Sequence, residues 1–176
     1  EGSEGRTVAE AADGGYFLSY YTYFSTNYVG CITKMNCTGA KEWEVFYDAG
    51  SVTLPTHILP QPDNGCLVSF STRSDVGDWN HVVTRLDEIG NTKWTSRLKM
   101  RVAHTTGGMV QTDDGSIYVC GNDTIAPNGK RGTTVARLNA SGNLVWQKHF
   151  ADGQDHTPLG ITVTSDNKIA VFGLAG

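Results

Sequence analysis

The sequence predicts an all-β fold built from a four-stranded unit that is repeated along the chain. Ten-residue segments of one pattern recur, the strand-like runs are rich in Val, Ile, Thr and aromatic residues, and no stretch combines helical periodicity with capping residues. The segments are KMNCTGAKEW at 34–43, RLDEIGNTKW at 85–94 and RLNASGNLVW at 137–146. Each carries a basic residue, an apolar residue, a turn with Gly and a Trp, so one structural device is used three times.

The period of the repeat is close to 50 residues. The repeated tryptophans are 51 and 52 residues apart, and the turn glycines keep the same intervals. These residues are Trp43, Trp94 and Trp146, with Gly39, Gly90 and Gly142. A second motif reads ADGGYFLSY from 12, PDNGCLVSF from 62, TDDGSIYVC from 112 and TSDNKIAVF from 164, which aligns Asp13, Asp63, Asp113 and Ser165. Such a period indicates units that stack and bury one another's faces.

The third repeat shows the expected strands most clearly. Strands are predicted at 107–112, 116–122, 133–139 and 143–149, separated by Asp-Gly and Ser-Gly-Asn turns that supply positive φ angles. A meander of four antiparallel strands at this period is typical of a β-propeller blade.

The prediction for residues 1–176 is therefore one domain, a β-propeller arc of about three and a half blades. The blades are expected at about 6–47, 56–98 and 107–149, followed by a half blade at 159–176. The repeated Trp of each blade should fill the gap between neighbouring sheets, where a large ring buries much apolar area.

The motifs resemble those of the secreted bacterial-type β-propeller repeats, which are related in style to quinoprotein-like and kelch-like propellers. Repeats of that family carry a DGGY-type turn, matched by Asp13–Tyr16, and a K-L-D-x-x-G-N-x-x-W-type hairpin, matched by residues 85–94. The resemblance covers nearly the whole chain, and it implies a propeller that acts as a surface or secreted scaffold or binder. The double Gly of kelch blades and the Ser-x-Asp-x-Gly-x-Thr-Trp box of sialidase propellers are absent.

Charge and hydropathy exclude several classes of partner. The formal net charge is −4, and no block of like charges interrupts the sequence, so nothing indicates a nucleic-acid footprint. No apolar run approaches the ~20 residues of a membrane-spanning helix. We expect neither nucleic acid nor a membrane span.

Three Asn-x-Ser/Thr sequons favour a secretory route. They lie at Asn36, Asn122 and Asn139, and each is a candidate for N-glycosylation. Asn36 and Asn139 also occupy the repeat position of Asp87, where a short polar side chain helps to close an Asx turn. Together with the cysteines and a start without Met, the sequons predict a secreted or cell-surface glycoprotein.

The four cysteines lie outside the repeat pattern, at Cys31, Cys37, Cys66 and Cys120. No Cys-x-x-Cys pair suggests a zinc knuckle or a redox motif. Cys37 and Cys66 fall at turns expected on the same face of the propeller, so they are the candidates for a disulfide. The alternative is four buried free thiols that pack as small apolar residues.

A polar group is expected at the rim of the central channel. His104 and His156 are repeat-equivalent, and Asp152 and Asp155 lie beside the second. This group could hold a metal or polarise a substrate, although loop packing and a local hydrogen bond explain the same residues. The aromatic run YFLSYYTYF at 16–24 admits a further alternative, a platform for stacking sugars.

The function predicted from the sequence is a non-enzymatic scaffold for adhesion or ligand binding, without catalytic residues, metal or cofactor. The alternatives are a propeller enzyme, either a hydrolase or a quinoprotein-like oxidoreductase, with a site at the channel rim, and a carbohydrate-binding lectin. An open arc leaves an unpaired strand edge, so we expect further blades of the same protein or other copies as partners, besides glycans or extracellular proteins.

Overall fold

A computed structural model describes residues 2–77, 79–100, 106–123 and 130–176, and this part of the chain contains strands but no helix. The strands are β1 (Ser3–Glu10), β2 (Tyr16–Phe24), β3 (Asn27–Met35), β4 (Lys41–Tyr47), β5 (Val52–Pro60), β6 (Cys66–Arg73), β7 (Trp79–Leu86), β8 (Thr92–Leu98), β9 (Thr106–Gln111), β10 (Ile117–Asp123), β11 (Gly132–Leu138), β12 (Leu144–Phe150), β13 (His156–Val163) and β14 (Ile169–Ala175). The all-β prediction is confirmed.

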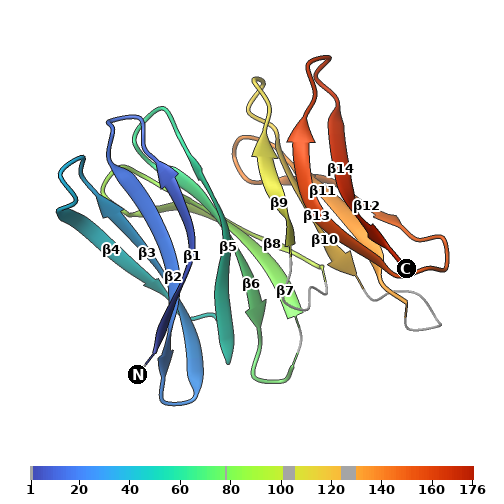
Figure 1. The fold of residues 1–176 in the computed structure, drawn as a ribbon, viewed down its shortest axis with the longest axis horizontal. Helices are drawn as coiled ribbons and strands as arrows, with labels where there is room; N and C mark the ends of the chain where they lie inside the picture. The colour runs from blue at the N-terminus through green and yellow to red at the C-terminus, as the bar shows by residue number, and fades with distance from the viewer. Residues whose placement is uncertain (1, 78, 101–105, 124–129) are drawn as a thin grey trace.

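Consecutive strands pair in antiparallel fashion within three successive units. The first unit is β1–β4, the second β5–β8 and the third β9–β12, and β13 and β14 form a separate hairpin. One parallel pair, Tyr28 with Val52, joins the first two units into an eight-stranded sheet. No sheet closes on itself in the described residues, and Figure 1 shows the units side by side in an open row.

The first strand of each unit lies next to the first strand of the following one. Contacts run from β1 to β5, from β5 to β9 and from β9 to β13. The first strands begin earlier than the sequence predicted, at residues 3, 52 and 156 instead of 6, 56 and 159. Their early parts are polar or interrupted by Pro, which weakens the hydrophobic alternation used to recognise a strand.

The hydrophobic core consists of layers between neighbouring units. One cluster of nine buried residues, including Phe17 and Phe70, lies between the first and second units. Another nine, including Leu98 and Met109, lie between the second and third. Between the third unit and the β13–β14 hairpin, only Cys120, Val135 and Ile161 are buried among the described residues.

The turn that connects the first two strands of each unit is closed by an Asp. The Oδ1 atom of Asp13 accepts the N–H of Gly15 at 2.9 Å, and Asp63 and Asp114 make the same bond two residues on. The following residue has a positive φ, 79° at Gly14 and 59° at Asn64, a conformation that Gly and Asn tolerate.

This turn corrects the sequence alignment of the motif. In the third unit the equivalent residue is Asp114 and not Asp113, and in the hairpin it is Asp166 and not Ser165, because the turn hydrogen bonds begin at Thr112 and Thr164. The interval between units therefore grows by one residue at each step, which a fixed period of 50 conceals.

The basic residue of each repeat pairs with the turn Asp of its own unit. Lys34 is 1% exposed, and its Nζ atom lies 2.8 and 2.7 Å from the two carboxylate oxygens of Asp13. That hydrogen bond holds the pKa of Asp13 below its ordinary value. Arg85 pairs with Asp63 and Arg137 with Asp114. Lys34 and Arg85 are nearly buried cations that need their carboxylates, whereas the side chain of Arg137 is 33% exposed.

The repeated tryptophans connect each unit to the next one. A Cβ atom on Gly90 would lie 3.1 Å from the Trp43 ring, and Trp43 Nε1 donates a 2.8 Å hydrogen bond to the carbonyl of Glu88. The Trp94 ring covers Gly142 more closely still. The rings of Trp43 and Trp94 therefore pack on the Gly turn of the following unit.

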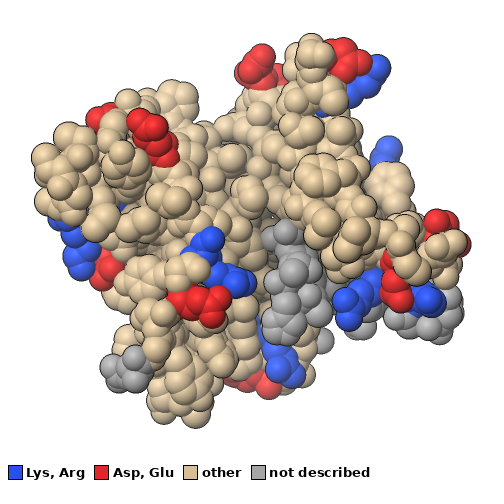
Figure 2. All heavy atoms as spheres, viewed as in Figure 1, with Lys and Arg blue, Asp and Glu red and all other residues tan. Residues whose placement is uncertain are grey.

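The surface shown in Figure 2 carries small groups of both charge signs and no extended patch of either. No helix in the described residues is long and apolar enough to cross a membrane.

Candidate functional site

The loop between β12 and β13 places a histidine against a carboxylate. His156 is the first residue of β13, and its Nε2 atom lies 2.6 Å from Oδ1 of Asp152. The backbone N–H of Gln154 donates to the same oxygen at 3.0 Å. The hydrogen bond from His156, followed by that from Gln154, lowers the pKa of Asp152. The ionised carboxylate, which accepts both hydrogen bonds, is therefore favoured.

The two basic residues that precede β11 contact the same loop, Lys130 through its side chain and Arg131 through its backbone. Asp155 Oδ1 accepts the backbone N–H of Arg131 at 2.8 Å, and Lys130 Nζ lies 3.5 Å from Oδ2 of Asp155. The Arg131 N–H is the main cause of the lowered pKa of Asp155. The backbone N–H of His156 donates to the carbonyl of Arg131 at 2.8 Å, which ties the loop to the third unit. His156, Asp152 and Asp155 thus lie together in a charged group.

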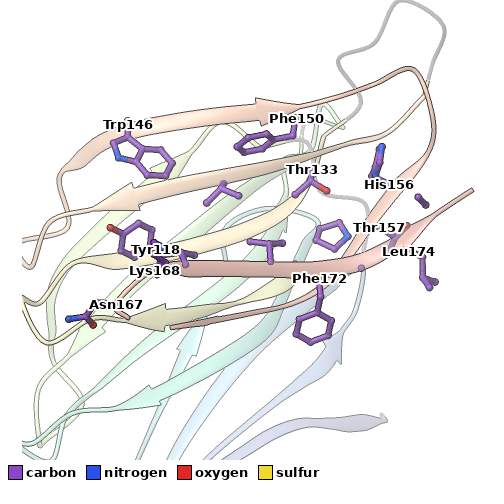
Figure 3. A pocket seen from close by; sticks show the side chains of 16 residues that line it. Tyr118, Thr133, Trp146, Phe150, His156, Thr157, Asn167, Lys168, Phe172 and Leu174 are labelled. Carbon is purple, nitrogen blue, oxygen red and sulfur yellow. The ribbon is translucent and has the colours of Figure 1, made fainter. Parts of the chain in front are cut away.

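A cavity of about 660 Å³ lies between the third unit and the β13–β14 hairpin. In Figure 3, His156 and Leu174 lie toward one end, and Tyr118, Trp146 and Lys168 toward the other. Most of the residues that line the cavity are apolar, among them Phe150, Pro158 and Val171. His156 is therefore a titratable group at the edge of an apolar cavity, an arrangement frequent in binding sites.

His104, the expected partner of His156, lies outside the described residues. Within the described ranges no group of three or more His, Cys, Asp or Glu side chains could hold a metal ion. Of the predicted group, the described residues therefore contain a His156–Asp152 pair and Asp155, which contacts Lys130 and the backbone N–H of Arg131. A place at the rim of a channel stays a prediction.

Sequence reasoning missed a pair of histidines between the second and third units. His81 on β7 is 0% exposed, and neither of its ring nitrogens has a hydrogen-bond partner. Burial, reinforced by the nearby His57, lowers the pKa of His81 to about 3. Burial also lowers the pKa of His57 on β5. Both lie off the repeat pattern, and no sequence signal marked their burial.

The sequon asparagines occupy different environments. Asn36 Oδ1 accepts the backbone N–H groups of Thr38 at 3.0 Å and Ala40 at 2.9 Å, and Asn139 closes the third hairpin in the same way. Both asparagines therefore close an Asx turn, as their place in the repeat predicted. Asn122 is 2% exposed and its amide atoms have no partner, so its nitrogen does not meet the solvent that a glycan needs. Glycosylation and secretion stay predictions.

The aromatic run on β2 alternates between the two faces of its sheet. Phe17 is fully buried against Trp43, with ring centroids 5.9 Å apart, whereas Tyr23 and Phe24 are exposed at the end of the strand. Tyr20 donates a hydrogen bond to Glu44 at 2.7 Å. Most of this run therefore packs or pairs within the first unit.

The expected Cys37–Cys66 disulfide is wrong. All four cysteines are free, and Cys66 is fully buried in the core between the first two units, whereas Cys37 lies exposed in a turn. Burial raises the pKa of Cys31 to about 11 and those of Cys66 and Cys120 to about 12. The alternative of free buried thiols holds for these three.

We expect a thiol reagent to modify only Cys37 in the folded protein at pH 8, because the other thiols are buried and stay protonated. All four should react in denaturant. Mass spectrometry after brief labelling measures both numbers, and Cys37→Ser is the control that should abolish labelling of the folded chain. Rapid native labelling of Cys66 would contradict the packing described here.

No family model and no curated protein sequence matches the chain, so the resemblance to secreted propeller repeats stays a prediction. Solved structures do share its fold. A Trp-to-Ala variant of the Synechocystis apocarotenoid oxygenase aligns with a TM-score of 0.53 and 7% identity, over 98% of this chain and 50% of that one. A Glu-to-Gln variant of that oxygenase gives a TM-score of 0.54 and 6% identity over the same shares.

A third match is an ACO/RPE65 chimera, with a TM-score of 0.57, 7% identity, and coverage of 100% of this chain and 51% of that one. The chain thus spans about half the length of these structures. They are β-propeller-type proteins, so the all-β fold is of that type.

The expectation of a non-enzymatic scaffold is contradicted by this comparison. The two Synechocystis structures that share the fold are variants of one protein, which is an oxygenase by name and hence an enzyme. At identities of 6–7%, these structures show that the fold is shared and nothing more.

Proposed function

We propose that this chain forms part of a propeller enzyme, with each four-stranded unit as one blade and the β13–β14 hairpin as the inner half of a fourth. The observation that carries the proposal is the 2.6 Å contact between His156 Nε2 and Asp152 Oδ1, beside a 660 Å³ cavity. A histidine oriented by a carboxylate is a common general acid–base arrangement in enzymes.

The reaction we propose is hydrolysis at the His156 end of the cavity. With the Nε2 proton directed at Asp152, Nδ1 is the nitrogen that accepts a proton from water, and the Asp152 carboxylate stabilises the imidazolium that forms. Lys130 Nζ lies beside Asp155 on the same loop, and the charge of Arg131 also favours the ionised form of Asp155. Both cations can stabilise an oxyanion that develops in the transition state.

The test uses p-nitrophenyl esters, phosphates and glycosides as probes. For a probe that is turned over, His156→Ala should lower kcat/KM by about 10²–10⁴-fold. Asp152→Asn should cause a smaller loss and change the pH profile, because it alters the partner of Nε2. His149→Ala is the control, since His149 instead bonds Thr134 at 3.1 Å.

Hydrolysis that survives His156→Ala unchanged would contradict the proposal. So would the absence of turnover with all three probe classes by a folded chain.

A further inference from the structure

The apolar part of the cavity lies beside the repeated Trp that, in the described residues, does not pack on a Gly turn. Trp43 packs on the turn of Gly90, and Trp94 packs on the turn of Gly142. Trp146 is the third member of the series, and its ring lines the cavity instead. The core on this side has three buried members, against nine in each of the other two layers.

The β13–β14 hairpin shows the same incompleteness. In the three units the second strand pairs on both sides, as β10 does with β9 and β11. In the described residues β14 pairs with β13 alone. Phe172 and Leu174 on β14 are 61% and 64% exposed, so the strand offers both an open backbone edge and uncovered apolar side chains.

Asp166 is a second anchor, independent of Trp146. It is the turn residue equivalent to Asp13, Asp63 and Asp114, which pair with Lys34, Arg85 and Arg137 on the third strand of their units. Asp166 instead contacts its neighbour Lys168 at 2.6 Å, and both side chains are more than half exposed. The position for a third-strand cation is therefore open.

We infer that this surface, made of Trp146, Asp166 and the free edge of β14, is a docking site for a β-hairpin that carries the chain's own repeat signature. The signature is a basic residue followed by an apolar residue, then a Gly turn and a closing strand. The occupant adds a strand to β14, a mode of recognition in which backbone hydrogen bonds supply affinity and side chains fix the register.

The register follows from the other units. The third-strand cations Lys34, Arg85 and Arg137 lie opposite Phe17, Leu67 and Tyr118, and the equivalent residue on β14 is Ala170. The occupant's basic residue should therefore lie opposite Ala170 and reach Asp166, while its Gly turn lies under the ring of Trp146.

This docking surface differs from the proposed catalytic rim. His156 pairs with Ala175, at the end of the β13–β14 hairpin opposite the Asp166 turn. A docked hairpin would convert the apolar body of the cavity into an interface between sheets, and it would leave His156 at the rim. The inference therefore stands whether or not His156 is catalytic.

The test appends a second copy of residues 132–150 after Gly176 through a flexible Gly-Ser linker, which raises the effective concentration of the hairpin. In hydrogen exchange, the β14 amides that do not pair with β13 should slow by about tenfold or more relative to the parent chain, because docking hydrogen-bonds them. A linker ending in a scrambled sequence of the same composition is the control.

A charge exchange tests the register. Arg137→Glu in the appended copy should remove most of the added protection, and Asp166→Lys in the receiving chain should restore it. Unchanged exchange at β14 in the fusion would overturn the inference, as would protection that ignores both charge changes.

Sedimentation of the parent chain tests for another occupant of this edge, the β14 strand of a second copy. Parent chains that dimerise in sedimentation, with β14 amides already protected, would show pairing between two β14 edges and would also overturn the inference.

Discussion

Trp94→Ala should lower the free energy of unfolding by about 3–5 kcal/mol, as for removal of a large packed side chain. The Trp94 ring packs against the core between the second and third units and covers Gly142. Its loss would open a cavity at the edge of this layer, next to buried residues such as Leu98 and Met109. Urea denaturation followed by circular dichroism measures the change.

Trp146→Ala is the matched control, because it removes the equivalent ring where no Gly turn lies beneath it. Its cost in the same chain should be clearly smaller than that of Trp94→Ala. Similar costs for the two variants would mean that the contact with the following unit contributes little. A fully stable Trp94→Ala protein that had lost a binding function would contradict the structural role of this residue.

Acidification from pH 6.5 to pH 5 should destabilise the protein by roughly 2 kcal/mol through His81 alone. The pKa of His81 is about 3 in the folded chain, against about 6.5 in the unfolded chain. Between these values the unfolded chain binds a proton that the folded chain does not, so stability falls as pH falls. His57 acts in the same direction, because burial lowers its pKa as well.

The interval from pH 6.5 to pH 5 separates this effect from that of the carboxylates. Asp13, Asp63 and Asp114 have lowered pKa values, so their contribution is present above the unfolded pKa, near 3.9, and declines mainly below pH 5. Urea unfolding at both pH values measures the loss.

His81→Leu should remove most of this pH dependence, and by replacing an imidazole without hydrogen-bond partners it should not weaken the protein greatly at pH 7. His149→Leu, which removes a partly buried imidazole elsewhere, is the control. An identical loss in the parent and in His81→Leu would show that other groups cause the acid sensitivity.

The sequence by itself determined the strands and their repetition. The spacing of Trp43, Trp94 and Trp146 beside turn glycines predicted units that pack face to face, and the structure places Trp43 and Trp94 on the next unit's Gly turn. Such patterns are local, because side-chain alternation and turn chemistry depend on neighbours within a few residues. The predicted strands of the third repeat accordingly match β9 to β12 within one residue at every end.

Tertiary structure alone decided which side chains meet. Cys37 and Cys66 are both close to turns in the sequence, yet one is exposed and the other fully buried. Nothing in a single sequence marked His81 as buried without a hydrogen-bond partner, because the burial of a strand residue depends on what packs over its sheet.

The candidate site illustrates the same division. The sequence placed Asp152 and Asp155 near His156, since all three fall within five residues. Asp152 contacts the imidazole, whereas Asp155 contacts Arg131 and Lys130. This choice depends on the segment that precedes β11, which reaches the loop only through folding. Proximity along the chain selects the residues, but burial and the choice between partners are set by contacts between distant segments, which a one-dimensional pattern does not contain.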